Sequence, residues 1–150
     1  MYLFLDYLEV LLVALLICIF CDVEQKNRYC LISSVISFLV MEFMQTYDLF
    51  GNEMAYAITI INFIIVSVMK KEIKFYNFIP CIFSQWISVF TSTIVLFFFK
   101  VITNYNIGNI IKLYRIPIIF LARILFFTLI VVLNYFKSKI KNTIMQNAVL

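Results

Sequence analysis

Long apolar stretches separated by short polar segments are the main feature of this sequence. Crossing the roughly 30 Å hydrocarbon core of a bilayer as a helix takes about 20 apolar residues. Five stretches approach or exceed this length, and charged residues lie mostly between them. We therefore predict membrane-spanning helices at residues 3–21, 29–47, 54–69, 75–102 and 117–136.

Composition supports this interpretation. The chain has 150 residues, of which 65% are hydrophobic and 13% charged, so a single soluble core could not bury its apolar surface. The expected fold class is all-α: a multi-pass bundle of five helices in direct contact with the lipid bilayer. No linker divides it, so we expect one bundle, 1–136, followed by a basic juxtamembrane tail, 137–150.

The distribution of lysine and arginine predicts an orientation. Cytoplasmic loops of membrane proteins are enriched in these residues. In a five-span chain the first loop, the third loop and the tail share one side, and they carry Lys26, Arg28, Lys70, Lys71, Lys74, Lys137, Lys139 and Lys141. The second loop has acidic residues but neither Lys nor Arg. We therefore expect the N-terminus outside and the C-terminus in the cytoplasm.

The fourth loop does not follow this rule, because Lys100, Lys112 and Arg115 would lie on the outer side. Two explanations are open. Either Ile107–Arg115 forms an amphipathic helix on the outer surface, or residues 103–116 hold an extra membrane element.

Four ionisable residues lie inside the predicted spans: Asp6, Glu9, Glu42 and Arg123. Inserting each of them into a membrane costs about 2.5–3.5 kcal/mol of free energy on insertion scales, so each is expected to have a partner or a functional role. At 1.5 Å per residue, Glu9, Glu42 and Arg123 all lie about 8–9 Å below the outer interface, with Asp6 one turn above Glu9. Arg123 is therefore expected to pair with Glu42 or with Glu9.

Two interpretations of these charges are open. They line a polar, ligand-binding pocket that opens to the outside and is bordered by Asp48 and Glu53, or they form a structural ion pair that fixes helix packing. The small and hydroxylated residues of spans two and four, including Ser33, Ser37 and Ser88, suit close helix contacts and interhelical hydrogen bonds.

Several function classes are excluded by what the sequence lacks. It has no histidine, which removes histidine-based zinc sites and Ser-His-Asp triads. Its two glycines, Gly51 and Gly108, cannot form a glycine-rich phosphate loop. We therefore expect no enzyme activity, metal or cofactor. The net charge of +4 is scattered and does not predict nucleic-acid binding.

Three features resemble a known family: the early acids of Leu5-Asp-Tyr-Leu-Glu9, short loops throughout, and a last span Arg115-Ile-Pro-Ile-Ile-Phe-Leu-Ala-Arg-Ile-Leu-Phe-Phe127 that continues into a basic tail. The chain resembles the N-terminal transmembrane sensor domain of AgrC/ComD-like (GHKL-type) peptide-pheromone receptor histidine kinases of Gram-positive bacteria. The likeness covers nearly the whole chain, but it lies in the hydropathy pattern more than in a sequence motif. Family members usually have six or more spans, one more than predicted here.

The resemblance implies a quorum-sensing module of the bacterial plasma membrane. It would bind a small secreted peptide at the outer face, form a homodimer and signal through its last helix. Kinase activity would need a further domain, since these residues include neither a phosphoacceptor histidine nor an ATP-lid glycine motif. The alternative is a small accessory membrane protein, either similar to bacteriocin-immunity factors or a transporter partner, whose intramembrane charges dock a membrane-protein partner.

Overall fold

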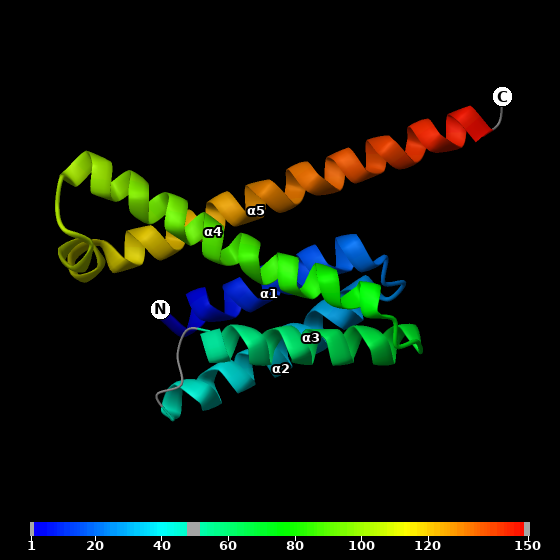
Figure 1. Cartoon of the computed structure of the whole chain (residues 1–150), viewed down its shortest axis with the longest axis horizontal. Helices are drawn as coiled ribbons and strands as arrows, with labels where there is room; N and C mark the ends of the chain where they lie inside the picture. The colour runs from blue at the N-terminus through cyan, green and yellow to red at the C-terminus, as the bar shows by residue number, and fades with distance from the viewer. Residues whose placement is uncertain (1, 48–51, 149–150) are drawn as a thin grey trace.

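Helices account for nearly all of residues 2–47 and 52–148, the part of the chain that the computed structural model describes (Figure 1). This part contains no strand. Its elements are α1 (Tyr2–Cys21), α2 (Lys26–Thr46), α3 (Asn52–Lys70), a short 3₁₀ turn η1 (Phe75–Asn77), α4 (Phe78–Thr103) and α5 (Ile107–Ala148). Most of the acidic second loop, residues 48–51, lies outside the described residues.

The prediction of an all-α membrane bundle is confirmed. Within the described residues, five helices are long and apolar enough to cross a membrane. Large apolar side chains point outward from them, and Trp86 on α4 is 73% exposed. Such exposure is unfavourable in water but suits side chains that face lipid tails. Which side each end of the chain occupies stays a prediction.

The last helix differs most from its predicted bounds. It begins at Ile107, ten residues before the predicted start at Pro117, and it continues through the predicted tail to Ala148. Pro117 therefore lies inside α5 and does not open it. A proline removes one helical hydrogen bond and its ring crowds the carbonyl four residues earlier. The backbone is accordingly kinked just upstream, at Tyr114 (φ −121°, ψ 19°).

Most of the predicted fourth loop, from Ile107 onward, is helical and belongs to α5. Residues 107–113 form a short helical segment that is joined to the main part of α5 at Tyr114. Ile110 in this segment is fully buried, and it packs with Val95 of α4 and Ile118 of α5. The other residues of the segment are exposed, so it contacts the bundle through one apolar side chain.

Helix α1 occupies the centre of the bundle. It packs against α2, α4 and α5, while α3 lies against α2 and α4. Residues 10–21 of α1 are apolar without interruption, and a helix that is apolar all round can be buried on every side. The main core forms around Val13, Leu16 and Ile17 of this stretch. Figure 1 also shows α4 and α5 crossing, with the C-terminal part of α5 running away from the other helices.

A buried asparagine joins α2 to α3. The side-chain carbonyl oxygen of Asn62 on α3 accepts hydrogen bonds from the hydroxyls of Tyr29 (3.1 Å) and Ser33 on α2. Its amide nitrogen donates to the Ser37 hydroxyl at 3.2 Å. All four side chains are almost completely buried. The predicted interhelical role of Ser33 and Ser37 is confirmed, with Asn62 as their shared partner.

Replacing Asn62 with alanine should weaken the α2–α3 contact. Three buried hydroxyls would lose a partner, and hydrogen bonds of this kind in membrane bundles contribute about 1–2 kcal/mol in model peptides. We expect Asn62→Ala to lower the free energy of unfolding by about this amount, measured by titrating the micelle-embedded protein with dodecyl sulfate. Asn134→Ala, at an exposed position of α5, is the control. Equal stability of the two variants would contradict the assigned role.

Candidate functional site

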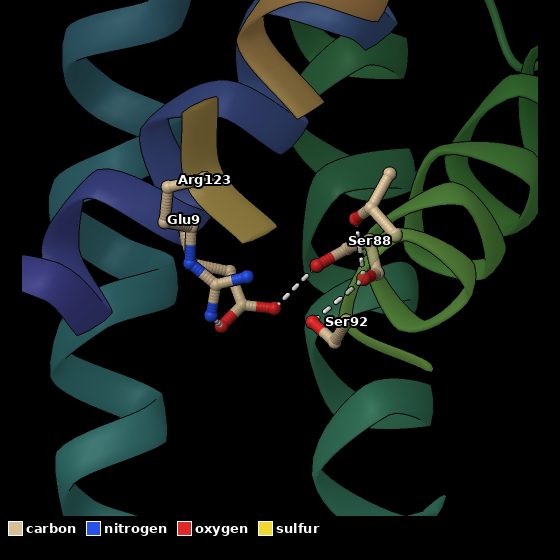
Figure 2. Close-up of polar contacts among 5 residues, drawn as sticks. Glu9, Ser88, Ser92 and Arg123 are labelled. Carbon is tan, nitrogen blue, oxygen red and sulfur yellow. Dashed lines mark hydrogen bonds and ion pairs between the residues drawn. The ribbon is translucent and has the colours of Figure 1, made fainter. Parts of the chain in front are cut away.

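A partly buried ion pair links the last helix to the first. Arg123 on α5 is only 6% exposed, and its guanidinium contacts the carboxylate of Glu9 on α1 (Figure 2). The second carboxylate oxygen of Glu9 accepts a hydrogen bond of 2.5 Å from the Ser88 hydroxyl on α4. One carboxylate therefore holds three helices together.

Ser88 donates its hydroxyl to another helix, whereas the hydroxyls of its neighbours Thr91 and Ser92 bond within α4. Ser92 and Thr91 donate to the backbone carbonyl of Ser88 at 3.0 and 2.9 Å. They are thus satisfied within α4, as is usual for Ser and Thr inside helices. Figure 2 shows Ser88 and Ser92 on the side of α4 that faces Glu9 and Arg123.

Part of the hydrogen-bonding capacity of this region is unused. A guanidinium has five N–H donors, but Nε and Nη1 of Arg123 are buried and have no hydrogen-bond partner in the described part of the chain. The same is true of Oε1 of Glu42 on α2. Buried polar atoms are normally satisfied, so unmatched donors on Arg123 and an unmatched acceptor on Glu42 point to a second arrangement or a bound group.

The structure places the predicted site residues in one region. Asp6 on α1 lies close enough to Glu9, Glu42 and Arg123 to be affected by their charges. Of the two partners considered for Arg123, Glu9 is the one that pairs with it. Together these four residues are called the charge cluster below.

Sequence reasoning did not assign Arg115 and Ser88 to the charge cluster. Arg115 also acts electrostatically on Asp6, whereas the sequence only placed it among the cations of the fourth loop. It precedes Arg123 by eight residues on α5, and its side chain is exposed. Ser88 was expected to make interhelical hydrogen bonds, as it does with Glu9, but this partner could not be predicted from spacing alone. Among the described residues, no three Cys, Asp or Glu side chains are placed to hold a metal ion.

A second contact joins α5 to α1 at the other end of α1. The Lys137 ammonium donates to the Ile19 carbonyl and, at 2.7 Å, to the Asp22 carboxylate. The hydrogen bond from Lys137 to the Asp22 carboxylate holds the pKa of Asp22 below its usual value. Lys70 of α3 donates to the Cys21 carbonyl at 3.0 Å. Cations are favourable at a helix C-terminus, where carbonyls lack partners and the dipole is negative.

No protein-family model, curated protein or solved structure matches the chain. The resemblance to AgrC/ComD-like receptors therefore stays a prediction, and the functional argument rests on the geometry of the charge cluster.

Neutralising the two acids considered for Arg123 should have different effects on stability. Removing one partner of a buried ion pair leaves an uncompensated charge and costs about 3–5 kcal/mol. We expect Glu9→Gln to lose about 3 kcal/mol or more of unfolding free energy in dodecyl sulfate titrations, because Arg123 would be stranded. Glu42→Gln should remain close to the parent protein. The reverse order would show that Arg123 pairs with Glu42 in the membrane.

Proposed function

We propose that this chain is a membrane sensor module, in which a ligand acts on the charge cluster and α5 carries the response to the other side of the membrane. The cluster is the input and the long last helix is the output. The ligand expected from the family resemblance is a small secreted peptide that approaches from outside a bacterial cell.

One observation carries this proposal. Arg123 is paired with Glu9 while two of its nitrogens and one oxygen of Glu42 remain buried without partners. A purely structural ion pair would be expected to satisfy its neighbours, since unpaired polar groups are costly in a low-dielectric interior. Arg123 instead has donors available for a second carboxylate, and Glu42 has an acceptor available for a ligand donor.

The position of the cluster fits an input site. Asp6 and Glu9 lie in the first two to three turns of α1, whereas Lys70 and Lys137 contact the opposite end of that helix. By the positive-inside rule the lysine-rich end is cytoplasmic, which leaves the acids near the outer surface. A cationic or amide-rich peptide that reached them would compete for Glu9 and release Arg123.

Helix α5 is suited to transmit such a change. From Arg123 it continues for 25 residues to Ala148, about 38 Å at 1.5 Å per residue. Its contact at Lys137 lies 14 residues, or about 21 Å, from the ion pair. A change of partner at Arg123 would rotate or tilt a helix that leaves the bundle at the far end.

The alternative is an accessory membrane protein that uses its intramembrane charges to dock a partner. The burial of Arg123 against its own chain favours the sensor, because a docking charge would be presented at the surface of the bundle. A stable, stoichiometric membrane partner after mild detergent extraction would favour the accessory role.

Peptide binding by the purified bundle tests the sensor proposal. Peptides fractionated from the culture medium of the cells that make the protein would be titrated against the protein in nanodiscs. We expect saturable binding by one fraction and at least a tenfold weaker affinity for Glu42→Gln, which loses the negative charge offered to a ligand donor. Glu24→Gln, an exposed acid between α1 and α2 at the opposite end of the bundle, should bind like the parent. Absence of saturable binding, or equal loss in both variants, would contradict the proposal.

A further inference from the structure

A groove between α1 and α5 lies at the end of the bundle opposite the charge cluster. It has a volume of about 740 Å³, within the range of small-ligand sites. Its walls are mostly apolar and include Phe20 of α1 with Leu133 and Phe136 of α5. Phe20 and Phe136 are 39% and 55% exposed, so the groove opens to the surroundings of the bundle.

Charged residues gather at one end of this groove. Lys137 and Lys141 of α5 line it together with Asp22. The lysines are four residues apart, so they lie one above the other on one face of the helix. Lys137 is committed to Asp22 and to the end of α1. Two lysines and one aspartate leave the groove with a net charge of +1, contributed mainly by exposed Lys141.

The groove is therefore amphiphilic and lies where a transmembrane span ends. Phe20 is in the last turn of the candidate span Leu3–Cys21, and Asp22 follows directly. Apolar walls at the level of the acyl chains, with a cation at the level of the headgroups, match a lipid that carries a negative headgroup. A zwitterionic choline lipid would place a second cation beside Lys141 and gains less from this arrangement.

We propose that the groove binds an anionic phospholipid, with its phosphate at Lys141 and the upper part of an acyl chain against Phe20, Leu133 and Phe136. The bound lipid would contact the end of α1 and the part of α5 that leaves the bundle. It would thereby set the angle at which α5 emerges.

Lipid titration of the full chain in neutral detergent micelles tests this proposal, because micelles remove the general surface potential of a bilayer. Phosphatidylglycerol and phosphatidylcholine of equal chain length would be added, and bound lipid counted by native mass spectrometry. We expect tighter binding of phosphatidylglycerol, weakened about fivefold by Lys141→Gln, as one well-formed exposed ion pair contributes about this factor. Lys141→Arg should retain it.

Lys139→Gln is the matched control. It removes the same charge two residues away on the same helix, at a residue that does not line the groove. We expect less than a twofold change in phosphatidylglycerol binding. Equal binding of the two lipids by the parent protein, or equal losses in Lys139→Gln and Lys141→Gln, would overturn the proposal and leave only non-specific attraction to the basic helix end.

Discussion

A guanidinium inside a membrane bundle requires a counter-charge, and in this protein Arg123 has that counter-charge in Glu9. The requirement is strict because a charge at the centre of a spanning helix costs about 2.5–3.5 kcal/mol even on the mildest scales. The ion pair between Arg123 and Glu9 turns the Arg123 face of α5 toward α1. Ser88 then adds α4 to the same carboxylate. One acidic side chain thus connects three of the five described spans.

The same geometry connects architecture with the proposed role. Helix α1 is apolar enough to be buried at the centre, and cations contact it at both ends. Near its start, the Glu9 carboxylate pairs with Arg123. At its end, backbone carbonyls accept hydrogen bonds from Lys70 and Lys137. Helix α5 contacts both ends of α1 and then continues beyond it. In the proposed role the unused donors on Arg123 allow the first contact to change, and the groove between α1 and α5 lies beside the second.

The sequence predicted the fold well because hydropathy determines where spans can lie. Depth arguments also selected Asp6, Glu9, Glu42 and Arg123 as neighbours, since residues at equal depth in a bundle can meet. They could not choose between Glu9 and Glu42, because that choice depends on helix rotation and on Ser88 from a third helix. Asn62, the one amide side chain inside the third predicted span, was the available indication of the α2–α3 contact. The kink at Tyr114 was missed because Pro117 was taken to start a helix.

Exchanging the charges of Glu9 and Arg123 tests the central claim most directly. Each single reversal, Glu9→Arg or Arg123→Glu, places like charges together inside the bundle and should sharply reduce the yield of folded protein from membranes. The double variant restores opposite charges at the same two positions. The account predicts that it recovers most of the folded yield, measured by size-exclusion chromatography in mild detergent. A double variant no better folded than the worse single reversal would contradict it.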